Sequence, residues 1–337
     1  MGSPGRLVTE RGYRISTRHP NVEPMAAVPR VLLTAARGFL GRALYLALAE
    51  RGVPVRCSSR NPEAAERAFF GREWVRLDPA DPGSIEAALE GCEAAIYLLH
   101  DPTADPDAQE ALARTFREAA AAAGLSRLVF PTLVPARAAD PLDRGRAAVM
   151  RVLLAGPVPT VVLRPSLVVG YGNWRWDLIR DLAARLLFVP IPRWAKARLQ
   201  PVAEEDFAAL VAAAATCEVP PGLYDAPGPE TVTLADLVRR TAARAGHRTV
   251  PLGLPFASRA LASRLVGLLT RDGAHARDLL RELGADRLAS SDAVWHLAGV
   301  ERRTLDAAID AALASDPVPS AESLVEQLVD RAARLRA

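Results

Sequence analysis

The amino-acid sequence predicts an α/β fold: a Rossmann-type doubly wound parallel sheet followed by a small, mainly helical C-terminal lobe. Three observations predict it. Short apolar runs alternate with helical patterns between residues 31 and 169, a turn of small residues joins the first run to its helix, and the alternation stops after Gly170. Parallel strands joined through helices require right-handed crossovers, with ligands at the carboxyl ends of the strands.

The first strand-turn-helix unit carries the strongest functional signal. An apolar strand over 31–33 is followed by a turn and by a helix over 42–51, and the spacing matches G-x-x-G-x-x-G. Gly38 and Gly41 fill the second and third places, and Ala35 stands where the first glycine is expected. Such a turn brings the backbone and a helix N-terminus close to a pyrophosphate. Alanine with a positive φ costs about 1 kcal/mol, so we expect the turn still to bind a pyrophosphate, but more weakly.

The later elements follow the same rhythm until residue 170. We expect strands over 53–59, 74–77, 94–99, 128–133 and 160–169, with helices over 63–70, 82–89, 108–123 and 144–154. Beyond them we expect a short strand over 222–226 and helices over 177–186, 201–217, 234–245, 258–269, 274–283, 305–314 and 320–336. The last helix is amphipathic and is expected to pack on the body, on a second subunit or on a protein partner.

The domain boundaries follow from these patterns. Residues 1–27 are expected to be a disordered tail, and Met25 is a candidate for the natural start. Residues 28–170 form the expected NAD(P)-binding Rossmann domain. Residues 171–337 form a mixed substrate and C-terminal lobe, interleaved with the last Rossmann elements.

Composition excludes several classes of function. The chain of 337 residues has a net charge of only +3, which does not indicate nucleic-acid binding. Arg164 interrupts the most apolar region, so no membrane span is expected. Cys57, Cys92 and Cys217 show neither metal-ligand spacing nor a disulfide framework, which favours a reducing cytoplasmic location and no metal.

Several segments, in their order and spacing, resemble a known family. They are Thr34–Gly41, Arg60-Asn-Pro, Asp78, Tyr97–His100 and Leu163–Gly170. Together they resemble atypical or extended short-chain dehydrogenases/reductases, most closely the NmrA-like and complex-I-accessory-subunit-like NAD(P)-binding proteins of bacteria. The resemblance covers roughly residues 28 to 314.

The resemblance implies a set of cofactor-binding positions. It places the pyrophosphate near the first turn, the adenosine beside the ends of the second to fourth strands, and the nicotinamide beside the ends of the fifth and sixth. The implied residues are Thr34, Ala35, Ala36, Arg37, Gly38, Phe39 and Leu40 at the turn, Ser59, Arg60, Asp78, Leu98 and His100 at the adenosine, Thr132, Pro165 and Ser166 at the nicotinamide, and Arg146 at the ribose.

The end of the second strand favours NADP(H) over NAD(H). An acidic residue there would bind the ribose 2′-hydroxyl of NAD(H), but the sequence reads Ser58-Ser59-Arg60. A guanidinium group can donate two parallel hydrogen bonds to a 2′-phosphate. Arg37, just before Gly38, resembles the basic residue of NADP-preferring relatives. The competing interpretation is that both arginines merely reflect an arginine-rich composition.

The usual catalytic pair of this family is missing. Active members carry Tyr-x-x-x-Lys on the helix after the fifth strand, but Leu142 and Arg146 stand at those positions. Thr132, Arg146 and Tyr171 are the remaining weak catalytic candidates, and each is also explained as a packing or pocket-lining residue. The pattern therefore leaves three hypotheses: an NADP(H)-dependent oxidoreductase acting on a small molecule; a non-catalytic dinucleotide-binding sensor, scaffold or assembly factor; and, weakest, a sugar-nucleotide epimerase or dehydratase.

Overall fold

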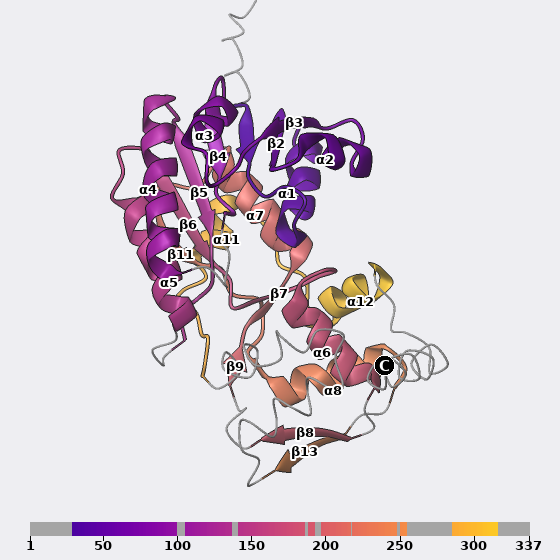
Figure 1. Ribbon diagram of the computed structural model, residues 1–337. Coiled ribbons are helices and arrows are strands. Elements are labelled where there is room, and N and C mark those ends of the chain that lie inside the picture. Colours follow the sequence, from indigo (N-terminus) through magenta and orange to yellow (C-terminus); the bar gives the residue numbers. More distant parts are fainter. Residues whose placement is uncertain are drawn as a thin grey trace, which may run out of the picture.

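A seven-stranded parallel sheet forms the centre of the computed structural model (Figure 1), which describes residues 29–99, 105–136, 141–185, 188–192, 197–216, 218–247, 250–254 and 285–315. The strand order is β11-β6-β5-β4-β1-β2-β3, and every neighbouring pair is parallel. Its strands are β1 (Val31–Leu33), β2 (Val55–Ser59), β3 (Glu73–Arg76), β4 (Ala94–Ile96), β5 (Arg127–Pro131), β6 (Thr160–Arg164) and β11 (Gly222–Asp225). This order confirms the doubly wound α/β prediction.

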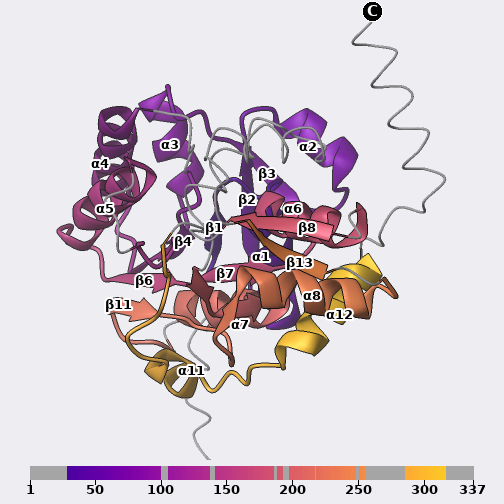
Figure 2. The same ribbon diagram turned by 90° about the horizontal axis from the view of Figure 1, so that it is seen from below.

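Helices cover both faces of the sheet (Figure 2). They are α1 (Phe39–Glu50), α2 (Pro62–Ala68), α3 (Pro82–Leu89), α4 (Pro106–Ala122), α5 (Pro141–Leu154) and α7 (Glu204–Ala215). Side chains alternate between faces along β1: Val31 and Leu33 pack in the core that contains α1 and α7, whereas Leu32 packs in the core that contains α3, α4 and α5. Burial on both faces explains why the strand sequences are apolar runs.

Two helices begin where local side chains fix their first turn. The Asn61 side chain accepts a hydrogen bond from the backbone of Ala64, and Pro62 opens α2. Asp81 likewise accepts from Ser84 at the start of α3, where Pro82 is the first helical residue. Proline suits this position because its missing N–H would have no partner there.

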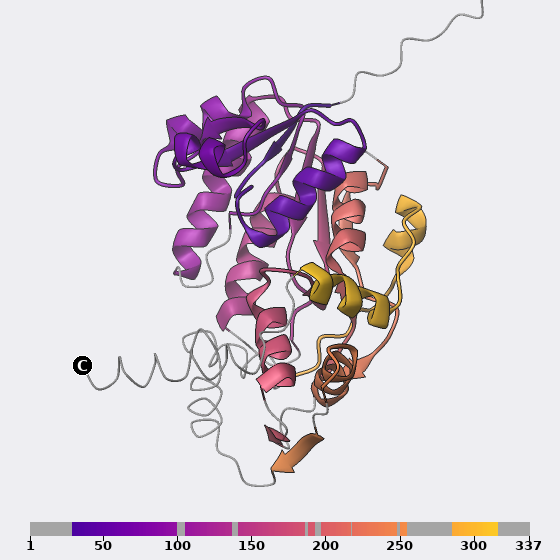
Figure 3. The same ribbon diagram turned by 90° about the vertical axis from the view of Figure 1, so that its right-hand side faces the viewer.

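The C-terminal lobe has its own core beyond one end of the sheet (Figure 1, Figure 3). Trp176, Ile179, Leu237 and Ile309 are among its buried residues. Its helices are α6 (Trp174–Arg185), α8 (Leu234–Arg244), α11 (Ala293–Ala298) and α12 (Leu305–Ser315), of which α11 packs beside the main sheet. Three two-stranded sheets complete it: β7 (Leu167–Val169) with β10 (Pro201–Ala203), β9 (Arg198–Leu199) with β12 (Val232–Thr233), and β8 (Phe188–Pro192) with β13 (Val250–Leu254).

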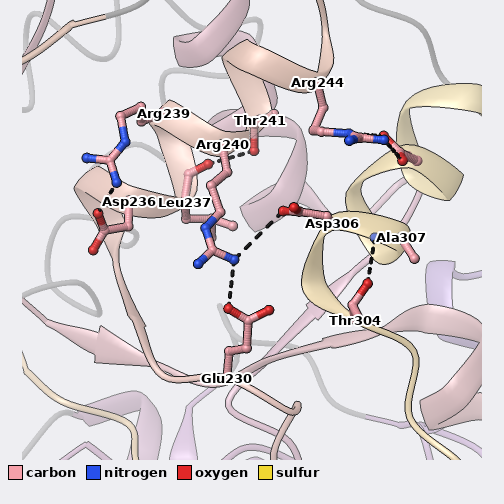
Figure 4. Close-up of polar contacts among 11 residues, drawn as sticks. Glu230, Asp236, Leu237, Arg239, Arg240, Thr241, Arg244, Thr304, Asp306 and Ala307 are labelled. Carbon is pink, nitrogen blue, oxygen red and sulfur yellow. Dashed lines mark hydrogen bonds and ion pairs between the residues drawn. The ribbon is translucent and has the colours of Figure 1, made fainter.

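Ion pairs join α8 to neighbouring segments of this lobe (Figure 4). The Arg240 guanidinium lies 2.7 Å from the Glu230 carboxylate and 3.7 Å from that of Asp306, at the start of α12. Arg244 binds the carboxylate of Asp310, also on α12. These surface pairs each contribute little to stability, and two of them join α8 to α12. No helix among the described residues is both long and apolar enough to span a membrane.

The structure corrects two predicted elements. The strand expected over 160–169 is two strands, because Pro165 cannot donate a ladder hydrogen bond; β6 stays in the main sheet and β7 pairs with β10. The helix expected from residue 201 begins at Glu204, since Pro201–Ala203 is β10. Strands β8, β9, β12 and β13 and helix α11 were not predicted. The tail 1–27 and the helices expected over 258–269, 274–283 and 320–336 lie outside the described residues.

Candidate cofactor-binding site

A cavity of about 1030 Å³ opens at the carboxyl ends of β1 to β4. The strand order reverses between β1 and β4, which is where open parallel sheets bind their ligands. The cavity walls come from the loops after these four strands and from the first turns of α4. The lining residues are Ala35, Arg37, Gly38, Ser58, Ser59, Arg60, Asn61, Leu77, Asp78, Pro79, Ala80, Leu98, Leu99, Ala108, Gln109 and Leu112.

The turn after β1 combines a left-handed residue with a close approach of α1. Ala35 adopts a φ of +47°, the left-handed conformation expected of a glycine at this place. A Cβ on Gly41 would lie 2.6 Å from the Ala35 carbonyl oxygen, so only glycine lets α1 pack this closely on the turn. Gly38 precedes α1 without any side-chain cap, and the first turn of α1 carries no acidic residue. The N-terminus of α1 is therefore suited to attract an anion.

Two arginines reach the same cavity from different strands. Arg37 belongs to the turn after β1 and Arg60 follows β2, and both side chains are exposed. The Ser59 hydroxyl donates to the Asn61 carbonyl at 3.1 Å, which shapes the turn that carries Arg60. Among the described residues, Asp78 is the one acidic residue of the lining, and its carboxylate accepts from Arg76 at 3.1 Å and from the Ala80 backbone at 3.2 Å.

Other residues expected near the turn support it from below. The Thr34 hydroxyl donates to the Ile96 carbonyl at 2.9 Å and accepts from the Leu98 N–H at 2.6 Å. Thr34 thereby joins the ends of β1 and β4 and fixes Leu98 at the cavity wall. Ala36 is buried, and Phe39 and Leu40 pack against the core; none of the three lines the cavity. His100 lies outside the described residues.

The residues expected near the nicotinamide lie at the ends of β5 and β6 and do not line this cavity. The Thr132 N–H donates to the Leu163 carbonyl at 2.9 Å, which continues the sheet. Pro165 separates β6 from β7. The buried Ser166 hydroxyl donates to the Arg287 carbonyl at 2.7 Å and accepts from the Gln200 N–H at 3.0 Å, so its hydrogen bonds join three segments of the chain.

Tyr171, the third catalytic candidate, lies after β7 and is 46% exposed. The Arg42 guanidinium lies 5.2 Å from the centre of its ring and donates to its carbonyl at 3.3 Å. Close by, burial raises the pKa of the Glu204 carboxyl to about 8; the neighbouring charge of Glu205 adds to this, and Arg42 opposes it. Glu204 therefore keeps a proton near neutral pH. Among the described residues, no cluster of His, Cys, Asp or Glu could hold a metal ion.

Comparisons with known proteins agree with this geometry. Residues 35–155 match a family model described as NAD(P)H-binding. A Citrobacter triphenylmethane reductase complexed with NADP(H) has a similar structure, with a TM-score of 0.69 and 18% identity over 84% of this chain and 100% of that one. The chain therefore has a Rossmann-type α/β fold, and its residues 35–155 are similar to NAD(P)H-binding domains.

Two further solved structures share this fold. An Escherichia coli NADPH-dependent quinone oxidoreductase complexed with NADPH has a TM-score of 0.66 and 18% identity, over 83% of this chain and 98% of that one. A Staphylococcus aureus nucleoside-diphosphate-sugar epimerase has a TM-score of 0.66 and 16% identity, over 83% and 99%. No curated protein matches the chain. At such identities the likeness establishes the fold and not the reaction.

Helix α5 carries the two positions that the resemblance described above assigns to a catalytic tyrosine and lysine. Leu142 and Arg146 stand there. Arg146 is 6% exposed, and its guanidinium lies 2.9 Å from the Asp143 carboxylate, less than one turn earlier on the same helix. Asp143 also accepts from the Ala136 N–H at 2.8 Å and from Arg287 at 3.1 Å. The cation at the lysine position is thus held by a buried network.

Sequence reasoning missed two residues of functional interest. Gln109, on α4, is buried and lines the cavity. The sequence feature that could have predicted this is Pro106, which starts α4 soon after β4. Arg287 comes from a segment with no regular secondary structure, and the sequence carries no local signal that places it beside α5.

Proposed function

We propose that the chain binds NADP(H) in the cavity at the ends of β1 to β4 and acts as an NADP(H)-dependent oxidoreductase on a small molecule. One observation carries the cofactor choice: Arg37 and Arg60 line the same cavity, and no carboxylate stands at the end of β2. A 2′-phosphate between two guanidinium groups gains charge-assisted hydrogen bonds, whereas NAD(H) would leave both arginines without an anion.

In this proposal each part of the cavity binds one part of the dinucleotide. The turn at Gly38 and the N-terminus of α1 bind the pyrophosphate, while Asp78 accepts from the adenine amino group. Leu98 and Leu99 form an apolar wall. When bound, the cofactor supplies or accepts a hydride. The residues of the chain bind and orient it and exclude water from its apolar side.

Helix α5 sets the class of reaction that we propose. Leu142 has no ionisable proton, and an arginine does not exchange its proton near neutral pH. We therefore propose direct hydride transfer to an electron-poor acceptor. A quinone and a cationic dye are such acceptors, because neither needs a tyrosine as proton donor. The quinone reductase and the triphenylmethane reductase with similar structures are consistent with this class.

Cofactor preference is tested by thermal shift with NADPH and NADH on the wild type, Arg37→Ala and Arg60→Ala. Each substitution should weaken NADPH binding about tenfold, because a hydrogen bond to a charged group contributes about 1.5–3 kcal/mol. NADH binding should change little. Arg67→Ala is the control, since Arg67 is exposed on the neighbouring α2 and does not line the cavity. Unchanged NADPH preference in both variants would refute the cofactor assignment.

A non-catalytic dinucleotide-binding sensor or assembly factor is the second candidate. The ion pair between Arg146 and Asp143 favours it, because this pair binds the cation at the lysine position. A panel of quinones, triphenylmethane dyes and aldehydes separates the two candidates. Steady NADPH oxidation with one class supports the oxidoreductase. Tight NADPH binding without turnover, together with a protein partner captured only in the presence of NADPH, supports the sensor.

A further inference from the structure

Ser58 is a buried serine that lines the cavity at the ends of β1 to β4. Only 2% of the residue is exposed. The hydroxyl groups of its neighbours Thr34 and Ser59 are both hydrogen-bonded within the chain. The Ser58 hydroxyl has no hydrogen-bond partner among the described residues. Buried polar groups rarely lack a partner, because the loss of water is then not compensated. This hydroxyl is therefore a candidate to bind a ligand in the cavity.

The side chain of Ser58 lies on the face of the sheet opposite α1. Side chains alternate along β2, and Cys57 packs in the core that contains α1. Three leucines that line the cavity belong to the core on the other face or pack against it, namely Leu77, Leu99 and Leu112. Ser58 therefore adds one hydroxyl group to an apolar part of the cavity wall.

This part of the wall suits a flat aromatic base better than a sugar. A ribose carries several hydroxyl groups that each need a partner, and leucine side chains offer none. A purine has apolar faces, and its ring nitrogens accept hydrogen bonds at its edges. A pocket that is mostly apolar and has a few placed polar groups fits such a ligand. Asp78, which the proposed function assigns to the adenine amino group, lines the same cavity.

The backbone around Asp78 leaves the base with few other donors. Pro79 has no N–H group. The Asp78 N–H donates to the Ser84 hydroxyl at 2.9 Å, and the Ala80 N–H donates to the Asp78 carboxylate at 3.2 Å. A ring nitrogen beside this segment therefore needs a donor from a side chain. A serine hydroxyl can donate one hydrogen bond, and the hydroxyl of Ser58 is not used within the described chain.

We propose that the Ser58 hydroxyl donates a hydrogen bond to a ring nitrogen of the adenine base of the bound dinucleotide, while Leu77, Leu99 and Leu112 contact the base. This inference rests on the proposed NADP(H)-binding function and adds a residue that determines which base the site accepts. Bound adenine supplies the partner that the buried hydroxyl lacks.

Competition against NADPH in the full-length protein tests the proposal. The probes are adenosine 2′-phosphate and its 1-deaza, 3-deaza and 7-deaza analogues, each of which has a C–H group in place of one ring nitrogen. We expect the wild type to bind one analogue roughly three- to tenfold more weakly than adenosine 2′-phosphate, as for one neutral hydrogen bond. Ser58→Ala should bind adenosine 2′-phosphate as weakly as that analogue, and should bind the two alike.

Ser126→Ala is the matched control. Ser126 is exposed and precedes β5 at the opposite edge of the sheet, where its hydroxyl donates to the Glu93 carbonyl at 3.0 Å. This substitution should leave the affinities for all four probes unchanged. Without ligand, Ser58→Ala should melt no lower than the wild type, because it removes no hydrogen bond within the chain.

The outcomes separate this inference from the proposed function. If Ser58→Ala weakens all four probes by one common factor, or weakens none, the hydrogen bond is refuted and the cofactor site stands. The same holds if ligand-free Ser58→Ala melts well below the wild type, since the hydroxyl then has a partner in the chain, or if adenosine 2′-phosphate does not displace bound NADPH. If the wild type does not bind NADPH, the proposed function falls, and this inference falls with it.

Discussion

Ala35 is the residue at which the phosphate-binding turn departs from the three-glycine pattern, and its φ of +47° places it in the left-handed region. Relief of that strain is worth about 1–2 kcal/mol, while a new glycine costs about 0.4–1 kcal/mol through the unfolded chain. Ala35→Gly should therefore raise the free energy of unfolding by about 0–1.6 kcal/mol and tighten NADPH binding. Chemical denaturation and calorimetry measure the two effects.

Ala36→Gly is the matched control for this prediction. Ala36 is fully buried and is absent from the positive-φ residues of the described chain, so glycine there gains no relief. It should lower the free energy of unfolding by roughly 0.5–1 kcal/mol. If Ala35→Gly is as destabilising as Ala36→Gly, the strain at Ala35 does not exist in solution.

At the scale of single residues, local features could be predicted from the sequence, and features that depend on distant residues could not. The spacing of Gly38 and Gly41 showed that Ala35 stands where the motif expects its first glycine, because a turn motif is local. The hydrogen bonds of Ser166 could not be predicted, because Arg287 lies 121 residues further along the chain. Arg146 was predicted to bind the ribose, and its ion pair with Asp143 depends on a helix register that the motif does not contain.

The contact between α1 and the turn is tested by Gly41→Ala. The added Cβ would lie 2.6 Å from the Ala35 carbonyl oxygen and 2.7 Å from the Ala36 Cα, and both are backbone atoms that cannot rotate away. We expect a loss of about 1–3 kcal/mol in the free energy of unfolding, together with weaker NADPH binding. Gly38→Ala, whose Cβ would lie 3.2 Å from the same oxygen, should cost less. Equal losses would contradict this packing.

The start of α7 should give stability a distinctive pH dependence. Burial raises the pKa of Glu204 to about 8, from an ordinary value of 4.5. Between these values the folded protein retains a proton that the unfolded chain releases, so this group lowers stability as pH rises through the window. Glu204→Gln mimics the protonated form. Its melting temperature should exceed that of the wild type by a margin that grows between about pH 4.5 and 8 and is then constant.

An exposed residue on another helix controls for the loss of a carboxylate. Glu118→Gln, on α4, should run parallel to the wild type across the whole pH range, because the side chain is 63% exposed. A parallel profile for Glu204→Gln as well would show that Glu204 is ionised normally in the folded protein.

At the scale of elements, periodicity identified the strands and helices of the main sheet. It failed at β7, because ten mostly apolar residues from Thr160 to Val169 resemble one strand. Pro165, which cannot donate a ladder hydrogen bond, ends β6, and β7 pairs with β10 instead. The two-residue strands β9 and β12 are too short for any pattern. Such strands exist only because distant segments pair.

The whole molecule places a dinucleotide-sized cavity where the strand order reverses, and this much follows from alternation of strands and helices. The alternation of strands and helices does not predict that Arg37 and Arg60 line the same cavity. Their loops meet only because β1 and β2 are neighbours in parallel register, with Leu33 opposite Cys57. The sequence therefore predicted the fold and the candidate residues, and the structure showed which of them share one cavity.

The ratio of the dissociation constants for NADH and NADPH tests the central claim most directly. Calorimetry at fixed ionic strength should be run on the wild type and on the Arg37→Ala/Arg60→Ala double variant. The wild type should bind NADPH at least tenfold more tightly than NADH, and the double variant should bind the two alike. Equal or tighter binding of NADH by the wild type, or no binding of either, would contradict it.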